Sequence, residues 1–355
     1  MKQSLSPDFW QDKRVLLTGH TGFKGGWLAL WLHSLGARVY GYSLIRDEAE
    51  KARADMLAPY VEQETGDICH VSAIAQAMRT FRPDIVVHLA AQALVRASYK
   101  EPLKTFASNV MGTACVLDAV RNTPGVRCAL IITTDKCYED RHWPWGYRET
   151  DRLGGYDPYS ASKAAAELVC AAWRSSFLAE GGVTVMSARA GNVIGGGDYA
   201  RDRLIPDMIK AFREGRFVEL RNPHAIRPWQ HVLEPLAGYL HLTRLAFEGR
   251  DVAGAWNFGP DEKQVQTVEW MTEHFAKAWG ISSSWTKDKS PHPHETDTLL
   301  LDCSKARRKL GWHPVLDAEQ TLEWTAAWYR REGEGGDPID LCLDQIRAYT
   351  HFFQE

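Results

Sequence analysis

Short apolar segments alternate with amphipathic segments along the first half of the chain. RVLLTG (14–19) and DIVVHLAAQ (84–92) are almost continuously apolar, which is typical of strands buried on both faces. GGWLALWLHSLG (25–36) carries apolar residues at helical spacing and closes on a glycine, a helix-ending signal. The expected strands are residues 14–19, 37–44, 84–92, 128–134 and 184–193, and the expected helices are 25–36, 72–83, 101–122 and 157–177.

This alternation predicts an α/β protein with a Rossmann-like, doubly wound parallel sheet that is covered by helices on both faces. After Gly195-Gly196-Gly197 the elements become shorter and richer in proline. We therefore expect a first domain over residues 1–194, joined by return segments around 228–260. Residues 195–355 should form mainly a smaller C-terminal lobe that binds the substrate. RREGEGGD (330–337) is expected to be a mobile loop before a last helix.

The composition excludes several classes of partner. A formal net charge of -3 gives no strong field that would recruit nucleic acid or an anionic membrane. No apolar run approaches the roughly 20 residues that span a membrane, and MKQSLSPDFWQDK (1–13) lacks the apolar region of a signal peptide. Seven cysteines without a CxxC pair favour buried thiols in a reducing compartment. A cytoplasmic protein without a metal site is expected.

Three glycines follow the first expected strand and precede the first expected helix. Gly19, Gly22 and Gly25 have G-x-x-G-x-x-G spacing. Glycine lets the backbone approach a pyrophosphate, and a helix N-terminus favours its negative charge. The segment therefore predicts a dinucleotide site, and Asp67 in TGDI is placed to meet the adenine amine. At the end of the second strand, Tyr42-Ser43-Leu44 stands where NAD binders usually carry an acid, which leaves NAD and NADP open.

Tyr159 and Lys163 form a candidate catalytic pair. They are four residues apart on an expected helix and so share one of its faces. A nearby ammonium favours the phenolate, which can then remove a proton from a sugar hydroxyl. Asn109, in the middle of another expected helix, either positions Lys163 or makes a packing contact.

The segment TTDKCY (133–138) places an acid and an amine directly after an apolar strand. Thr134 would orient a substrate. Asp135 and Lys136 either form a solvated turn or carry out proton chemistry on a bound substrate.

Several motifs match the pattern of one family. They are TGHTGFKG (18–25), HLAAQ (88–92), TTDKCY (133–138), WPWGYRETDRLGGYDPYSASK (143–163), RAGNVIGGGD (189–198), RPWQHVLEPL (227–236) and LDCSKARRKLGW (301–312). Over nearly its whole length the chain resembles the extended short-chain dehydrogenase/reductase family. Within that family it is similar to the nucleotide-sugar 4,6-dehydratases, and among these to the ones acting on CDP-glucose.

The resemblance implies that CDP-glucose loses water to become CDP-4-keto-6-deoxyglucose, with NAD as the cofactor. Tyr159 would deprotonate the C4 hydroxyl, and Asp135 would protonate the departing C6 hydroxyl. Lys136 would be the C5 base or an enolate stabiliser, where sister dehydratases carry Glu. The implied cofactor contacts are Gly19, Thr21, Gly22, Phe23, Lys24, Gly25, Asp67, Ile68, Leu89, Ala90, Ala91, Asn109, Tyr159 and Lys163, and the implied nucleotide-sugar contacts are Gln92, Asn192, Arg203 and Arg227.

Two other functions share this fold. A nucleotide-sugar 4-epimerase uses the same glycine loop and Tyr–Lys pair, but it needs no Asp135–Lys136 pair. A non-catalytic NAD(H)-sensing regulator often lacks the Tyr or the Lys, which this chain keeps. The helices expected at 101–122 and 157–177 lie where this family forms a homodimer through a four-helix bundle, although their apolar stripes also suit ordinary core faces.

Overall fold

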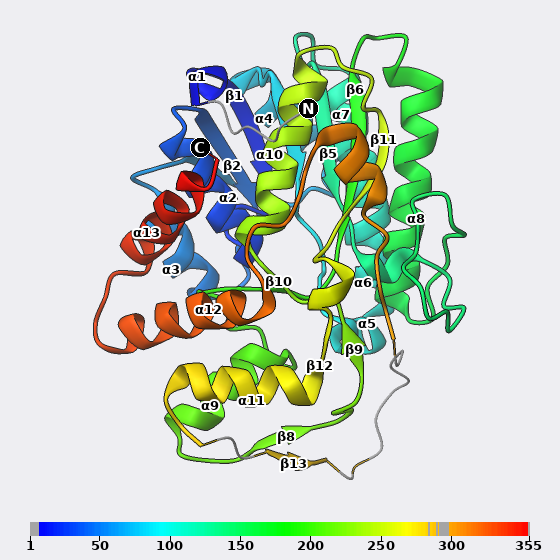
Figure 1. The fold of residues 1–355 in the computed structure, drawn as a ribbon. Coiled ribbons are helices and arrows are strands. Elements are labelled where there is room, and N and C mark those ends of the chain that lie inside the picture. Colours follow the sequence, from blue (N-terminus) through cyan, green and yellow to red (C-terminus); the bar gives the residue numbers. More distant parts are fainter. Residues whose placement is uncertain (1–6, 283–284, 289, 291–297, 354–355) are drawn as a thin grey trace.

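A parallel sheet of seven strands forms the centre of the protein, in a computed structural model that describes residues 7–282, 285–288, 290 and 298–353 (Figure 1). Residues 1–6, in the segment expected to lack a signal peptide, lie outside the described part. The strand order is β11-β6-β5-β4-β1-β2-β3. The strands are β1 (Arg14–Thr18), β2 (Arg38–Ser43), β3 (Glu62–Thr65), β4 (Ile85–His88), β5 (Cys128–Ile132), β6 (Thr184–Ala190) and β11 (Gly254–Phe258).

Helices cover both faces of this sheet, so the expected doubly wound α/β fold is confirmed. Leu16 of β1 packs in one apolar core and Leu17 in the other, because successive side chains of a strand point to opposite faces. Helices α2 (Phe23–Ser34) and α10 (Leu233–Phe247) pack on one face, and α4 (Val71–Phe81), α7 (Gly112–Arg121) and α8 (Pro158–Trp173) pack on the other.

The chain after Ile194 divides its elements between a small lobe and the sheet. The lobe, in the lower part of Figure 1, includes α9, α11, β8 and β13. Helix α10 and strand β11 return to the sheet, and α13 packs against α2. The remaining elements are α1 (Pro7–Trp10), α3 (Glu48–Leu57), α5 (Val95–Lys100), α6 (Pro102–Phe106), β7 (Val193–Ile194), α9 (Leu204–Arg213), β8 (Val218–Leu220), β9 (Ile226–Arg227), β10 (Gln230–His231), β12 (Gln266–Thr267), α11 (Val268–Trp279), β13 (Trp285–Lys287), α12 (Ala318–Gly333) and α13 (Pro338–His351).

Several expected elements differ from the structure. The strand expected over 84–92 ends at His88, and the helix expected over 157–177 passes from α8 into a π-helical turn at Arg174–Leu178. The helix expected over 101–122 is interrupted by a π-helical turn at Ala107–Met111, which separates α6 from α7. The loop expected from residue 330 begins later, because α12 continues to Gly333. Arginines in a last turn interact favourably with the negative end of a helix, and Arg330 and Arg331 occupy that turn. None of the described helices is long and apolar enough to span a membrane.

Glu234, in the first turn of α10, fastens the C-terminal part of the chain to the sheet layer. Its buried carboxylate accepts hydrogen bonds from the backbone N–H of Val315 at 3.0 Å and of Leu316 at 2.7 Å. It also accepts one from the hydroxyl of Tyr349, in α13, at 2.8 Å. Burial raises the pKa of Glu234 to about 7, against the opposing effect of these bonds.

The raised pKa of Glu234 predicts a pH-dependent contribution to stability. The folded state holds this proton more tightly than the unfolded chain, whose ordinary value is 4.5. The contribution is therefore full below pH 4.5 and is lost as the pH rises to about 7, by roughly 3 kcal/mol. Urea unfolding of the wild type and of Glu234→Gln should show the free-energy difference between them shifting by that amount. Glu248→Gln, at the exposed end of α10, is the control. A difference that stays constant with pH contradicts the assignment.

Candidate active site

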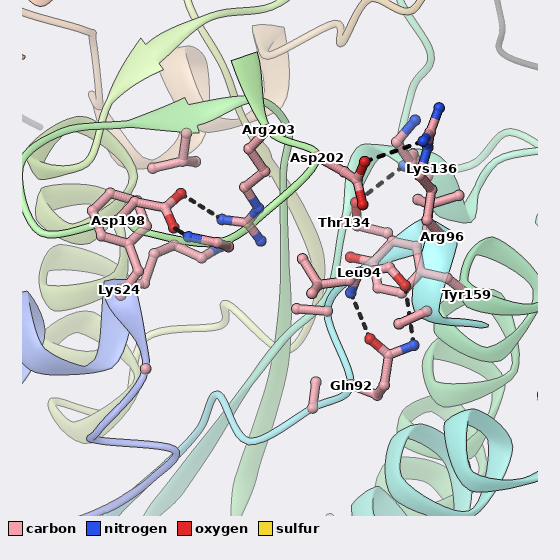
Figure 2. A pocket seen from close by; sticks show the side chains of 18 of the residues that line it. Lys24, Gln92, Leu94, Arg96, Thr134, Lys136, Tyr159, Asp198, Asp202 and Arg203 are labelled. Carbon is pink, nitrogen blue, oxygen red and sulfur yellow. Dashed lines mark hydrogen bonds and ion pairs between the residues drawn. The ribbon is translucent and has the colours of Figure 1, made fainter. Parts of the chain in front are cut away.

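A cavity of about 1000 Å³ opens at the carboxyl ends of the strands. The strand order reverses between β1 and β4, and ligands of open α/β sheets bind at such a crevice. All the residues that the sequence predicted for catalysis, cofactor or substrate line this cavity, except Asn109. Figure 2 shows Lys24, Asp198 and Arg203 on one side of it and Thr134, Lys136 and Tyr159 on the other.

The glycine loop is pressed between β4 and the start of α2. Gly19 has a φ of +76°, and a Cβ there would lie 2.6 Å from the backbone nitrogen of Ala90. A Cβ on Gly25 would lie 2.0 Å from the carbonyl oxygen of Gly19. Gly22 is the N-cap of α2 and makes no side-chain hydrogen bond to the first turn of the helix. This surface fits a pyrophosphate, which the helix N-terminus attracts.

A buried histidine that the sequence analysis missed supports this loop. His20 makes hydrogen bonds through Nε2 to Gln63 at 2.8 Å and through Nδ1 to Ser43 at 2.8 Å. The loop is thereby joined to the ends of β2 and β3. The sequence shows His20 as a polar residue between two glycines of the loop. Its partners could not be inferred from this, because they lie 23 and 43 residues further along the chain.

The cavity wall near β2 and β3 suits the adenosine half of a dinucleotide. Arg46 pairs with Glu50, so a carboxylate already offsets its charge. Asp67 lines the cavity, and its Oδ1 accepts the backbone N–H of Cys69 at 2.9 Å. Ile68 beside it is buried.

Strand β5 delivers the acid and the amine to the cavity through one turn of 3₁₀ helix at Asp135–Cys137. Thr134 caps this turn, and its hydroxyl donates to Oδ1 of Asp135 at 2.9 Å. Asp135 is only 1% exposed, whereas Lys136 is partly exposed. The alternative of a solvated turn is therefore wrong for Asp135, because the turn faces the cavity instead of the outer surface.

Tyr159 and Lys163 extend from the first two turns of α8. Asp157 caps this helix by accepting the backbone N–H of Ser160 at 3.0 Å, which fixes where the helix begins. The backbone N–H of Tyr159 donates to Oγ of Ser98 at 3.1 Å. The Nζ of Lys163 donates to the carbonyl of Ile132, the last residue of β5, at 3.1 Å. The helix is thus tied to the strand that carries Thr134 and Asp135.

Burial shifts the pKa values of three groups that line the cavity in the direction that favours their neutral forms. Burial raises the pKa of Tyr159 to about 12, although a hydrogen bond with Thr134 lowers it. Burial lowers the pKa of Lys163 to about 8. It also lowers the pKa of Lys24 to about 7, with help from the charges of Lys163 and Arg203. A bound anion would restore the charge of these amines.

Of the two roles left open for Asn109, the hydrogen bonds of its side chain agree with a packing contact. Its Nδ2 donates to Oγ of Ser162 at 2.8 Å, and its Oδ1 accepts the backbone N–H of Gln92 at 2.8 Å. The side chain of Gln92 in turn binds the backbone of Leu94 and the hydroxyl of Thr105. Asn109 thus connects the loop after β4 to α8, and Gln92 connects it to α6.

A buried ion pair that the sequence analysis missed lies behind the catalytic turn. Arg189 is 3% exposed and pairs with Glu167 at 2.8 Å. Glu167 also accepts hydrogen bonds from Thr133 at 2.5 Å and from Ser187 at 2.6 Å. Arg189 donates to the hydroxyl of Tyr138 at 2.8 Å. The pair joins β5, β6 and α8 one residue behind Thr134.

Three further polar side chains line the cavity. Arg203 pairs with Asp198 at 2.8 Å, Arg227 is buried at the cavity wall, and Asn192 has a left-handed backbone with a φ of +41°. Trp229 also lines the cavity, whereas Trp145 is 57% exposed and lies outside the lining.

The segment that presents Arg203 is fixed from two directions. The hydroxyl of Tyr329, in α12, accepts the backbone N–H of Asp198 at 2.9 Å and donates to its carbonyl at 2.6 Å. The indole of Trp27, in α2, donates to the carbonyl of Gly196 at 2.9 Å. Among the residues that the structure describes, no cluster of His, Cys, Asp and Glu could hold a metal ion.

The chain belongs to the GDP-mannose 4,6 dehydratase family, whose model matches residues 16–325. A CDP-glucose 4,6-dehydratase from Salmonella typhimurium strain LT2 is 47% identical over 97% of this chain and 98% of its own. A dTDP-glucose 4,6-dehydratase from Streptomyces griseus is 29% identical over 79% of this chain and 81% of its own.

Solved structures share the fold. A UDP-glucose 4-epimerase from Thermotoga maritima, solved with UDP-glucose, has a TM-score of 0.78 at 22% identity, covering 90% of this chain and 99% of that one. A dTDP-glucose 4,6-dehydratase from Streptomyces venezuelae, solved with NAD and TYD, has a TM-score of 0.76 at 24% identity, covering 92% and 99%.

The glycine contacts predict a loss of dinucleotide binding in Gly25→Ala. The added Cβ would lie 2.0 Å from the carbonyl oxygen of Gly19, so the loop must move away from its position against α2. Calorimetric titration with NAD should show affinity lowered by at least about tenfold, equivalent to roughly 1.4 kcal/mol. Gly26→Ala is the matched control, since its Cβ meets nothing nearer than 3.7 Å. Equal NAD affinity in the two variants would show that the loop does not hold the cofactor.

Proposed function

We propose that this protein is a hydro-lyase that converts CDP-glucose to CDP-4-keto-6-deoxyglucose with NAD as its cofactor. The observation that carries the proposal is the cavity that unites the glycine loop, Tyr159 and the Asp135–Lys136 pair. A 4-epimerase of this fold needs the first two features but does not eliminate water between C5 and C6. The 47% identity to a CDP-glucose 4,6-dehydratase supports both the reaction and the cytidine base.

The glycine loop and the wall beside it support NAD as the cofactor. A side chain at Gly19 or Gly25 would collide with neighbouring backbone, so glycine at both positions keeps the tight loop that a pyrophosphate site needs. The pairing of Arg46 with Glu50 argues against NADP, because a 2′-phosphate there would meet the carboxylate as well as the guanidinium. When bound, NAD supplies the chemistry of accepting a hydride from C4 of the sugar and returning it to C6.

The side chains around β5 would move the protons of this reaction. Tyr159 would take the proton of the C4 hydroxyl, since a positively charged nicotinamide next to the phenol favours the phenolate. The C4 ketone then acidifies C5, whose proton Lys136 would remove. Asp135 would protonate the C6 hydroxyl, which leaves as water. A lysine acting as a base must be neutral, so Lys136 serves as the base only when its ammonium has lost its proton.

Three polar side chains of the cavity wall would bind the nucleotide. Arg203, Arg227 and Asn192 offer two guanidinium groups and an amide to the diphosphate of a nucleotide sugar. Asp198 holds Arg203 in place from behind.

Exposed apolar side chains on α6, the π-helical turn and α8 support a homodimer. Leu103, Met111 and Leu168 are between 58% and 84% exposed and lie on α6, the π-helical turn and α8. We propose that a second copy covers them; sedimentation equilibrium at twice the chain mass would support this and a monomer would contradict it. The seven free cysteines, six of them buried, support a reducing compartment such as the cytoplasm.

The proposed reaction is tested by incubating the NAD-loaded protein with CDP-, dTDP-, UDP- and GDP-sugars. Mass spectrometry should show the loss of one water from CDP-glucose, whereas an epimerase product keeps the substrate mass. Tyr159→Phe should lower C4 oxidation by about 10² to 10⁴ because the phenol that takes the hydroxyl proton is gone. Tyr60→Phe, which removes a hydroxyl outside the cavity lining, is the control. Absence of turnover with every nucleotide sugar would exclude the dehydratase.

The role of Lys136 as the C5 base predicts two matched results. Lys136→Ala and Lys136→Arg should both retard deuterium incorporation at C5 from heavy water, as measured by NMR of the product, because arginine stays protonated. If Lys136 only stabilises the enolate, the Lys136→Arg variant would keep the exchange while the Lys136→Ala variant loses it. Lys51→Ala, on the exposed surface of α3, controls for the loss of an amine.

A further inference from the structure

The carboxyl of Asp135 lies directly against the main chain that follows β6. Gly191 is the first residue after this strand. A Cβ on Gly191 would lie 1.8 Å from Oδ2 of Asp135, 2.3 Å from its Cγ and 2.9 Å from its Oδ1. The carboxyl therefore fills the space that a side chain at position 191 would need. Oδ2 is buried and has no hydrogen-bond partner among the described residues, so packing alone holds this oxygen.

The other oxygen of the carboxyl is held by a hydrogen bond. The hydroxyl of Thr134 donates to Oδ1 of Asp135 at 2.9 Å. Asp135 is 1% exposed and lines the cavity. Gly191 lies outside the lining, between Ala190 and Asn192, which belong to it. One oxygen is thus fixed by a hydroxyl, and the other by the absence of a side chain at the end of the neighbouring strand.

The backbone does not require glycine at position 191. The φ of Gly191 is negative, unlike that of Gly197 at +78°, so its backbone suits an ordinary L residue. The atoms nearest to an added Cβ all belong to the end of the Asp135 side chain, which can turn aside without moving any backbone. What glycine preserves at this position is therefore the place of the carboxyl.

We propose that Gly191 is a positioning residue for the acid, because its missing side chain lets the carboxyl of Asp135 lie where it can protonate the C6 hydroxyl. This inference rests on the proposed function. In that step the C5 proton passes to Lys136, and the electrons of the C5–H bond form a double bond between C5 and C6. The C6–O bond breaks, and the departing hydroxyl takes the proton of Asp135 to become water. Such a transfer needs the two oxygens within about 3 Å of each other.

Gly191→Ala tests this role in single turnovers. Oδ2 of Asp135 would have to retreat from 1.8 Å to at least 3.0 Å from the new Cβ. With protein, NAD and CDP-glucose mixed by stopped flow, the rise of NADH absorbance measures C4 oxidation, and its fall measures elimination followed by hydride return. The rise should keep the wild-type rate. The fall should slow by about tenfold to a hundredfold, as expected for a group displaced by about 1 Å, so NADH should accumulate.

Gly259→Ala is the matched control. Gly259 is also buried and is the first residue after β11, the strand that pairs with β6. A Cβ there would meet nothing nearer than the Sγ of Cys303 at 3.5 Å, which is an ordinary contact. Both phases should therefore keep their wild-type rates in this variant.

A double variant with Asp135→Asn distinguishes placement of the acid from a general structural effect. Asparagine has the size of aspartic acid but no acidic proton, so Asp135→Asn alone should slow the fall. If Gly191 acts through the acid, adding Gly191→Ala should slow the fall by less than about twofold more, because two residues that serve one group are not additive. Independent roles would instead multiply the two effects.

Three results would overturn the positioning role while leaving the dehydratase intact. The first is a fall in Gly191→Ala at the wild-type rate; a loss of CDP-glucose affinity alone, measured by calorimetry, would mean that Gly191 places Asn192 instead. The second is multiplied effects in the double variant. The third is an unfolded Gly191→Ala protein by circular dichroism, because the carboxyl would then not be the group that yields. If the wild type forms no keto-deoxy sugar, the proposed function fails and the positioning role fails with it.

Discussion

The reversal of strand order between β1 and β4 is the constraint on which the site depends. Parallel strands end at the same edge of a sheet, so Gly19, Ala90 and Thr134 come together although they are far apart in sequence. The reversal also sends α2 and α8 to opposite faces, which leaves their N-termini at the two sides of one crevice. The glycine loop and the first two turns of α8, with Tyr159 and Lys163, therefore line the same cavity.

The pair of Glu167 and Arg189 gives this edge its rigidity. Two charges buried at 3% exposure require complete hydrogen bonding, and removing one partner of such a pair costs about 3–5 kcal/mol. Glu167 also accepts hydrogen bonds from the hydroxyl of Thr133, just after β5, and from that of Ser187 in β6, so it ties both strands to α8. The same contacts fix Thr133, so the next residue, Thr134, has little freedom. The Glu167–Arg189 ion pair is thus buried behind the end of β5, whereas Asp135 and Lys136 line the cavity in front of it.

The sequence could predict those features whose determining residues all lie within one short segment. The buried strands, the glycine loop and the four-residue spacing of Tyr159 and Lys163 each follow from a short segment, and the sheet and the cavity lining agree with them. The contacts of His20 with Gln63 and Ser43 and the pairing of Glu167 with Arg189 could not be predicted. Each joins segments whose relative position is known only after the sheet has formed. The choice between the two roles left open for Asn109 had the same obstacle, since its partners Gln92 and Ser162 lie in distant segments.

The hydrogen bonds of Trp27 and Tyr329 to the segment from Gly196 to Asp198 link two parts of the cavity wall. Trp27 belongs to the helix whose N-terminus faces the cofactor loop, and Asp198 holds the arginine on the opposite side of the cavity. The helix that begins at the glycine loop and the segment that presents Arg203 are therefore joined across the cavity by direct hydrogen bonds.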